Sequence, residues 1–255
     1  MSKTASPASR TAVVLAALVL LAIAHVPSAA AAGVARSSAA REPWPGPRAS
    51  SAWLADIVYP TVGRIAPYSH ARVAIRVPSA SAWGGPEQLL VLGSRVDPGG
   101  GEWVRVRLDV RPNGEAVWLN ANYVTLHKTH WRVVVSRAQR RLRVYWKGRL
   151  RRTWRVVVGK PSTPTPSGLF AIAAELRQPR PGGFVGSWVL PLTAHSNVLM
   201  HFAGGDGQTA LHGRGGASLA DPLGSARSHG CIRMDNAMIA WLANHVPVGT
   251  PVLVR

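Results

Sequence analysis

The residues best suited to chemistry in this sequence are one cysteine and two histidines. Cys231, the single cysteine, ends the string Ser-His-Gly-Cys at residues 228–231, and fifteen residues separate His212 from that string. A thiol is nucleophilic as the thiolate, and at an ordinary pKa near 8.5 only about 3% of it is ionised at pH 7. A neighbouring imidazole can take the proton, and Gly230 lets the backbone turn so that consecutive amide N–H groups point at a developing oxyanion. These residue types predict acyl transfer at a carbonyl.

The residues alone leave two readings open. A lone cysteine beside a histidine also fits a small buried hydrophobic residue with an inert thiol. His229 is nearer to Cys231 in sequence than His212 is, so either imidazole is a candidate for the base. His195 and His201, taken together with Cys231, have no recognised metal-ligand spacing, so we expect no metal site.

The string and its surroundings resemble the signature of the L,D-transpeptidase catalytic domain. His212 matches the upstream histidine of that signature, and residues 163–170 resemble the family's Thr-Pro-x-Gly-x-Phe turn. Further matches are Gly159, Gly213, Met234 and the Gly-Thr-Pro-Val string at residues 249–252. The likeness extends over about residues 130–255. The order of histidine before cysteine argues against papain-like peptidases, in which the cysteine comes first.

This resemblance implies a fold and a reaction. The fold is mainly β, a catalytic β-sandwich of mixed sheets with a short C-terminal helix. The reaction begins when Cys231 attacks the carbonyl of the third residue of a peptidoglycan tetrapeptide stem, a diamino acid, and expels the terminal D-alanine. A side-chain amine of a second stem then resolves the thioester and forms a 3→3 cross-link. The resemblance implies no cofactor, and it implies covalent inhibition by carbapenems.

The resemblance also assigns roles within the site. His212 corresponds to the proton donor and acceptor, and the carbonyl of Gly213 orients its ring. The oxyanion side is formed by His229, Gly230 and Cys231, mainly through backbone N–H groups.

Three further residues are candidates for binding substrate. The guanidinium of Arg233 suits a carboxylate, although the same side chain is equally a candidate for bracing the loop. Arg214 stands where many family members have a small residue, and it is a candidate for recruiting a stem carboxylate. Ser228 is a candidate for substrate contact or, with more weight, for stabilising the turn.

The N-terminal segment predicts export. Lys3 and Arg10 precede an apolar run at residues 11–24, and small residues follow at 28–32. This pattern is typical of a secretory signal peptide, and the run is shorter than the roughly 20 residues of a membrane span. We therefore expect residues 1–32 to be removed, the protein to lie in the cell wall or on the extracytoplasmic face of the envelope, and membrane contact only during export.

Composition and charge restrict the partners. The 255 residues include 30 Lys and Arg against 11 Asp and Glu, a net charge of +19, and 47% are apolar, enough for a packed core. Residues 132–155 contain ten cations and no acid. Such a surface suits either nucleic acid or the anionic polymers of an envelope. Because the signal peptide opposes the first, we expect stem peptides and anionic wall polymers as partners and no nucleic acid.

The remaining sequence predicts the domain organisation. Residues 33–65 are rich in Pro, Ala and Ser and predict a linker. Residues 66–127 have short apolar strands, such as 73–77, 89–92 and 103–108, separated by turn signals, and they resemble a small bacterial SH3-like β-barrel. Residues 128–255 form the expected catalytic domain. Trp83, Trp103 and Trp118 are predicted, with more weight, to lie in the core of the SH3-like module, and the alternative is that they form platforms for binding sugars.

Two other functions fit the same sequence. In an L,D-carboxypeptidase, water instead of an amine resolves the thioester. In a non-catalytic wall-binding protein, the SH3-like module and the positive surface hold the envelope, and loss of Cys231 leaves binding intact.

Overall fold

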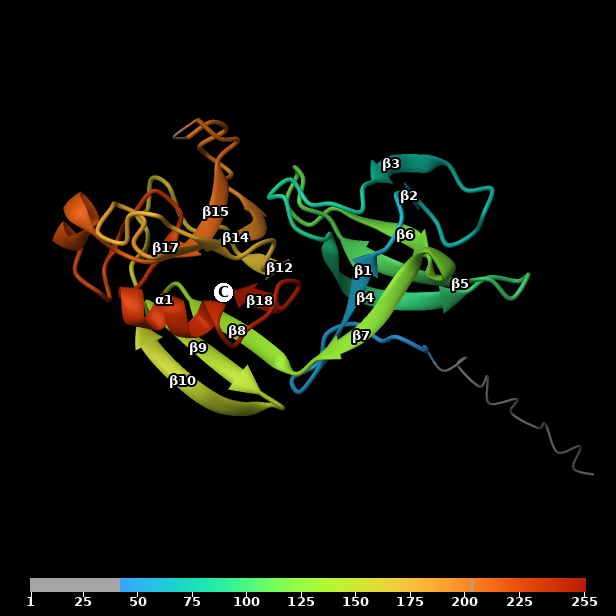
Figure 1. Ribbon diagram of the computed structural model, residues 1–255, viewed down its shortest axis with the longest axis horizontal. Coiled ribbons are helices and arrows are strands. Elements are labelled where there is room, and N and C mark those ends of the chain that lie inside the picture. Colours follow the sequence, from blue (N-terminus) through green and yellow to red (C-terminus); the bar gives the residue numbers. More distant parts are fainter. Residues whose placement is uncertain (1–41, 203) are drawn as a thin grey trace, which may run out of the picture. The chain divides into compact units, whose positions relative to one another are not determined.

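The computed structural model describes residues 42–202 and 204–255; the signal peptide expected over 1–32 lies outside the described residues. Strands dominate this part of the chain, and one α-helix accompanies them (Figure 1). The prediction of a mainly β fold with mixed sheets and one short helix is confirmed. Within the described ranges, no helix is long and apolar enough to cross a membrane.

The N-terminal half forms one seven-stranded antiparallel sheet in the order β3-β2-β6-β5-β4-β1-β7. Its elements are β1 (Ala52–Ile57), β2 (Thr61–Arg64), β3 (Val73–Val77), β4 (Gln88–Val96), β5 (Glu102–Arg107), β6 (Ala116–Asn120), the 3-10 helix η1 (Ala121–Tyr123) and β7 (Val124–Thr129). Alternate apolar side chains, such as Val104 and Val106 on β5, point into a common core, as the period of a half-buried strand requires. The likeness of this half to an SH3-like module stays a prediction.

The described part of the expected linker is structured. Strand β1 lies within residues 33–65 and is paired on both sides, with β4 and with β7. Upstream of it, the Ser94 N–H donates to the Glu42 carboxylate at 2.7 Å, and Trp44 packs against the core of the sheet. The linker prediction is therefore wrong for this part. It was based on the overall content of Pro, Ala and Ser, whereas β1 itself has four buried positions in six residues.

The tryptophans of this half differ in burial. Trp103 is 2% exposed and lies in the core as predicted, and Trp118 is partly buried. Trp83 is 41% exposed, so its prediction as a core residue is wrong. Its indole lines a pocket instead.

The C-terminal half contains two mixed sheets and a small two-stranded one. The five-stranded sheet has the order β10-β9-β8-β18-β12, the four-stranded sheet β13-β14-β15-β17, and β11 pairs with β16. The strands are β8 (Trp131–Ser136), β9 (Arg141–Trp146), β10 (Arg149–Arg155), β11 (Val158–Gly159), β12 (Gly168–Ala171), β13 (Leu176–Arg177), β14 (Trp188–His195), β15 (Gln208–His212), β16 (Ala226–Ser228), β17 (Ile232–Arg233) and β18 (Pro251–Val254). The parallel pairs β8–β18 and β15–β17 make the two larger sheets mixed.

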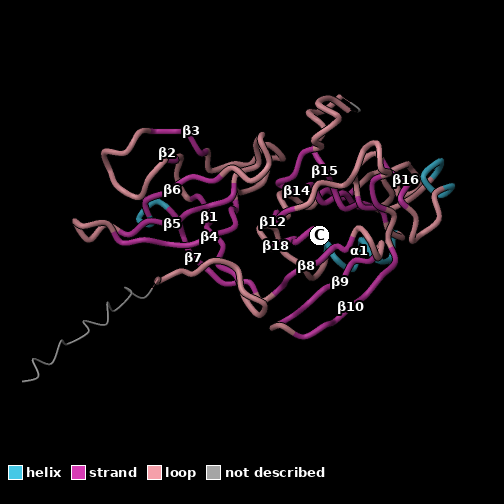
Figure 2. The backbone as a smooth tube through the Cα atoms, turned by 180° about the vertical axis from the view of Figure 1, so that it is seen from behind, coloured by secondary structure: helices cyan, strands magenta, loops and turns pink. Residues whose placement is uncertain are grey.

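The α-helix found among the described residues packs between these two larger sheets. α1 (Asn236–Ala243) occupies the position predicted for a C-terminal helix, and a 3-10 helix, η2 (Gly216–Ala220), precedes β16. Figures 1 and 2 both show α1 between the β8–β10 strands and the β14–β15 strands. Its Ile239 and Leu242 are fully buried in a core to which both sheets contribute, including Val144 and Leu211. This core fixes the ends of β15 and β17 relative to each other.

Candidate active site

The site is built where β15 and β17 run side by side. The two strands pair in parallel, with His212 opposite Arg233, and Cys231 immediately precedes β17. This register brings His212 and Cys231, nineteen positions apart, to the same pocket of about 430 Å³. The exposed side chain of His229 lines the pocket as well. Three of the residues predicted for the chemistry therefore meet at one place.

The walls of the pocket are largely apolar. Phe184 precedes β14, and Phe202 follows it. The Phe202 ring stacks on the imidazole of His229, with centroids 5.4 Å apart and planes 28° from parallel. Trp83 adds an indole from the N-terminal half. Sequence reasoning did not single out either phenylalanine, and no local motif marks them.

The loop before Cys231 depends on a glycine. Gly230 has φ +126°, a conformation that L side chains rarely adopt, so a Cβ at this position would strain the backbone. The Ser228 hydroxyl spans the turn: it donates to the Cys231 carbonyl at 2.6 Å and accepts from the Gly230 N–H at 3.2 Å. The loop is thus closed on itself by its own first residue.

A second segment braces the same loop from outside. The hydroxyl of Thr165, 1% exposed, donates to the Gly230 carbonyl at 2.8 Å and accepts from the Gly159 N–H at 2.9 Å. Thr163 makes a longer contact, 3.4 Å, with the Ser228 carbonyl. The Thr-Pro turn noted in the sequence therefore holds the cysteine loop in place.

His212 is held as a neutral imidazole. The ring is 3% exposed, and Nδ1 lies 2.7 Å from the carbonyl oxygen of Gly213. Because a carbonyl only accepts, Nδ1 carries the hydrogen and Nε2 has the lone pair. Burial, with a smaller contribution from the charge of Arg233, lowers the pKa of His212 to about 4, although hydrogen bonds to the backbone of Gly213 and Val185 partly oppose the shift. At neutral pH this ring is therefore uncharged, with a lone pair on Nε2.

Gly213 leaves no room for a side chain. A Cβ at Gly213 would collide with Oδ1 of Asn236, the first residue of α1, and with the backbone of Gly186. The same Oδ1 accepts from the Ser187 N–H at 2.9 Å. The start of α1 thereby fixes the backbone that carries the carbonyl acceptor of His212.

Cys231 is held as a thiol. Its side chain is partly exposed to the pocket, yet the packed surroundings remove most of its water. This burial raises the pKa of the thiol above its ordinary value, against the opposing effects of a backbone hydrogen bond with Ala210 and the charge of Arg233. The resting site is thus a neutral thiol with a neutral imidazole, so proton transfer belongs to the reaction itself.

Arg233 has an ion-pair partner and also faces the pocket. Its guanidinium donates to the Asp221 carboxylate at 2.6 Å and lies 4.8 Å from the centroid of the Phe184 ring. The residue is only 4% exposed but lines the pocket. Both sequence readings, bracing and facing a substrate, are compatible with this placement.

Two predicted substrate contacts are not supported by the placement of their side chains. The guanidinium of Arg214 donates to the Asp235 carboxylate at 2.5 and 3.2 Å and to the Asp221 carbonyl at 2.7 Å, and it does not line the pocket. Ser228 is fully buried, and its hydroxyl is used within the loop. Arg214 instead anchors the N-terminus of α1, and Ser228 shapes the turn, which is the role that the sequence favoured for it.

The amide of Gly230 also differs from expectation. Its N–H donates to Ser228 Oγ and therefore does not point at a ligand, because each N–H satisfies one strong acceptor. Gly230 contributes through its backbone conformation and through its carbonyl bond to Thr165.

The other histidines considered for a metal lie apart from the cysteine. Nε2 of His195 lies 2.9 Å from the Asp206 carboxylate, and His201 is exposed. In residues 42–202 and 204–255, no three His, Cys, Asp or Glu side chains gather as metal ligands.

Comparisons with known proteins match the half of the chain that carries this site. Residues 130–254 match the YkuD family model, described as the L,D-transpeptidase catalytic domain. A Bacillus licheniformis protein provisionally named L,D-transpeptidase YkuD is 39% identical over 124 residues, which cover 49% of this chain and 65% of that protein. Its Bacillus subtilis counterpart is 33% identical, over 49% of this chain and 66% of its own length. A second B. subtilis protein, provisionally named L,D-transpeptidase YqjB, is 30% identical over 48% of this chain and 69% of its own.

The chain belongs to the YkuD L,D-transpeptidase family. The family model does not extend to the N-terminal half of this chain, and the aligned residues span slightly less than two thirds of the first two relatives. Solved L,D-transpeptidases from Mycobacterium smegmatis and Mycobacterium tuberculosis are 20% and 16% identical over 79% and 78% of the chain, covering 99% and 98% of those chains, with TM-scores of 0.40 and 0.43.

Proposed function

We propose that this protein is an exported L,D-transpeptidase that forms 3→3 cross-links between peptidoglycan stems. The observation that carries the proposal is the meeting of Cys231 and a neutral His212 in one pocket, within a chain of the YkuD family. The thiol adds to the carbonyl of the third stem residue while Nε2 of His212 takes the thiol proton. Collapse of the adduct expels D-alanine, whose amine receives that proton, and leaves a thioester on Cys231.

The second half of the cycle reverses these steps. The side-chain amine of another stem adds to the thioester, His212 takes a proton from the attacking nitrogen, and the thiolate leaves and is reprotonated. Because the resting pair is neutral, His212 acts as a general base at the moment of attack. The N–H groups of His229 and Cys231 are our candidates for the oxyanion side, since Ser228 occupies that of Gly230.

Arg233 is the residue we propose to contact the substrate. Its guanidinium lines the pocket with the Asp221 carboxylate on one side, which leaves the rest of the group for a second acceptor. A stem carboxylate is an acceptor of the right charge. The same pocket is our proposed site of acylation by carbapenems, because a strained lactam carbonyl reacts with the same thiol.

Analysis of the products tests the reaction. The mature protein is mixed with a tetrapeptide stem fragment, and the products are weighed by mass spectrometry, with Cys231→Ala as the control. A dimer that has lost one D-alanine, absent with the control, supports transfer. Tripeptide alone identifies hydrolysis, the L,D-carboxypeptidase reaction. Unchanged tetrapeptide together with no carbapenem adduct on Cys231 favours a non-catalytic wall-binding protein and contradicts the proposal.

Anionic wall polymers are a second proposed partner. Strand β10 is an edge strand, and its arginines at positions 149, 151, 152 and 155 are exposed, next to further arginines on β9. Because surface charges are screened by salt, we expect binding to a polyphosphate-type polymer to weaken strongly between low and physiological ionic strength. We also propose that residues 66–127 are an SH3-like module and that residues 1–32 are removed during export. The mass of the exported chain tests the removal.

A further inference from the structure

We propose that Arg111 and Asn113, in the loop between β5 and β6, are positioning residues for one wall of the Cys231 pocket. The wall is the segment of residues 195–202 and 204–208, here called the rim segment, which runs from the last residue of β14 to the first residue of β15. This inference rests on the proposed function where KM for the tetrapeptide is measured, whereas the hydrogen-exchange measurement does not depend on that function.

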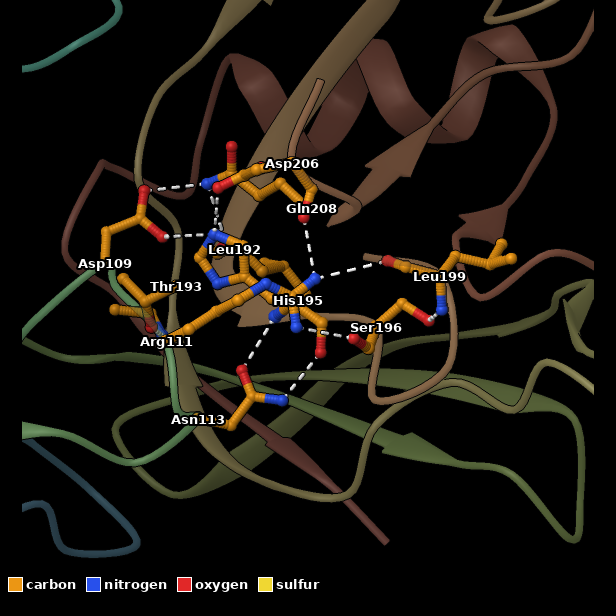
Figure 3. Close-up of polar contacts among 11 residues, drawn as sticks. Asp109, Arg111, Asn113, Leu192, Thr193, His195, Ser196, Leu199, Asp206 and Gln208 are labelled. Carbon is orange, nitrogen blue, oxygen red and sulfur yellow. Dashed lines mark hydrogen bonds and ion pairs between the residues drawn. The ribbon is translucent and has the colours of Figure 1, made fainter. Parts of the chain in front are cut away.

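Arg111 connects the two arms of the rim segment. One guanidinium nitrogen donates to the Ser196 carbonyl at 2.7 Å, and the other donates to the Leu199 carbonyl at 3.2 Å and to the Asp206 carbonyl at 2.7 Å (Figure 3). These acceptors belong to the outgoing and the returning arm. A planar fork of donors is suited to this bridge, whereas a lysine ammonium concentrates its donors at one point.

The side chain of Asn113 pairs with the backbone of His195 at the end of β14, as a neighbouring strand would. Its Oδ1 accepts from the His195 N–H at 2.7 Å, and its Nδ2 donates to the His195 carbonyl at 2.6 Å (Figure 3). The same Nδ2 also donates to Asn197 Oδ1 at 3.0 Å. The two bonds to His195 imitate the ladder of an adjacent strand. Both backbone polar groups of His195 are thereby satisfied by a residue of the N-terminal half.

Side-chain contacts at the base of the rim segment add to this clasp. Gln208 donates through Nε2 to the Asp109 carboxylate at 2.7 Å and to the Leu192 carbonyl at 3.0 Å. The His195 ring reaches the Asp206 carboxylate at 2.9 Å. The rim segment is therefore attached to the β5–β6 loop at its start, in its middle and at its return.

The rim segment in turn forms the pocket. Ser196, Leu199, Phe202 and Gln208 line it, and the ring of Phe202 stacks on His229, two residues before Cys231. A displacement of the rim segment thus changes the surface offered to the acyl donor. It does not change the Cys231–His212 pair, which is fixed by the pairing of β15 with β17.

The test compares full-length variants at matched positions. Arg111→Ala removes the bridge, Arg111→Lys keeps the charge without the fork, and Asn113→Asp keeps the shape but replaces the donor. Arg105→Ala is the control, because Arg105 is an exposed arginine on β5 of the same sheet. Each variant is assayed for hydrogen exchange at residues 196–208, for KM and kcat with the tetrapeptide, and for alkylation of Cys231 by iodoacetamide.

We expect Arg111→Ala to speed exchange across residues 196–208 and to raise KM roughly tenfold, the loss expected from hydrogen bonds to a charged group. Arg111→Lys should recover part of both effects, and alkylation should stay at the wild-type rate. Asn113→Asp should also speed exchange and raise KM without changing alkylation, but by smaller factors. If Arg111→Ala fails to fold, this variant tests the inference in its place.

Exchange and KM that match the Arg105→Ala control would overturn the inference. The inference would also be overturned if Arg111→Ala slowed the alkylation of Cys231 by the same factor by which it raises KM, because this would indicate general disruption of the site. If the wild-type protein shows no transfer or hydrolysis, the proposed function fails, while the exchange measurement still decides whether Arg111 and Asn113 hold the rim segment.

Discussion

Two buried histidines lie at opposite ends of the β14–β15 pair, and they have different partners. His212 ends β15, and His195 ends β14; they are 3% and 2% exposed. His212 donates to a neutral carbonyl, whereas His195 contacts the Asp206 carboxylate. Burial lowers the pKa of both rings.

The hydrogen-bond partner, and not burial, makes a buried histidine a candidate base. A carbonyl partner fixes the tautomer of His212 and leaves the lone pair of Nε2 for chemistry. The carboxylate occupies Nε2 of His195, and that residue's backbone is held by Asn113. His212 lines the pocket, and His195 supports its wall. Burial alone does not separate the two roles.

The largest expected effect distinguishes the two histidines directly. His212→Asn removes the proposed base and should lower kcat by about a thousandfold, within the range typical of general-base catalysis. His195→Asn should change kcat by less than about threefold and instead lower the melting temperature, because a hydrogen bond to a charged group is lost. Steady-state kinetics and thermal unfolding of both variants check this. Equal losses of kcat would remove the distinction between the two rings.

The pKa of His212 predicts a pH dependence of stability. Its folded-state pKa of about 4 lies below the ordinary value of 6.5, so the contribution is present above pH 6.5 and is lost as the pH falls towards 4. Relative to His212→Asn, the wild type should lose roughly 2 to 3 kcal/mol of unfolding free energy between pH 7 and pH 4.5.

Urea unfolding of both proteins at the two pH values measures that loss. The comparison with His212→Asn is needed because burial raises the pKa of Glu87, Asp109 and Glu175 to about 7. These carboxyls contribute stability at low pH that is lost as the pH rises towards 7, the opposite sign. An unchanged difference between the two proteins would show that His212 titrates normally.

The next effect is a loss of unfolding free energy when Thr165, which braces the cysteine loop, is replaced. Thr165→Val leaves the buried Gly230 carbonyl and Gly159 N–H without their partner and should cost about 2 kcal/mol. Thr163→Val is the matched control, since its single contact is 3.4 Å long, and it should cost less than about 1 kcal/mol. Urea unfolding ranks the two variants, and the reverse order would contradict the assignment of Thr165 as the brace.

The smallest effect distinguishes the buried Arg233 from the partly buried Arg214. Arg233→Ala should raise the KM for the tetrapeptide about tenfold, because a guanidinium that faces the pocket is lost. Arg214→Ala should change KM by less than about twofold, since that side chain is bound to Asp235 outside the pocket lining. Initial rates over a range of substrate concentrations give both values. A large change of KM for Arg214→Ala would restore the original prediction of a substrate contact.

Local patterns in the sequence were sufficient for much of this account. Short apolar segments between turn signals predicted the strand at residues 73–77 as observed, and a short C-terminal helix was expected where α1 lies. The cysteine string, with the histidine upstream, pointed to the residues that the structure brings to one pocket. These features depend on neighbours in sequence or on a family signature.

The missed features depend on contacts between distant residues. Arg111 and Asn113 reach partners more than eighty positions away, and nothing in their own loop signals it. Arg214 was a candidate for substrate because it stands where many family members have a small residue, and nothing near it in sequence indicates its ion pair with Asp235, 21 positions away. Trp83 was placed in a core because burial is the common fate of tryptophan.

The most direct test of the central claim is to trap the acyl-enzyme. The protein is mixed with tetrapeptide, quenched in acid within seconds, and weighed intact, alongside Cys231→Ser and His212→Asn. We predict an added mass equal to the tetrapeptide less D-alanine, located on Cys231 by peptide mapping, absent with Cys231→Ser and formed far more slowly with His212→Asn. Release of D-alanine without an adduct on Cys231, or with the serine variant at the wild-type rate, would contradict the account.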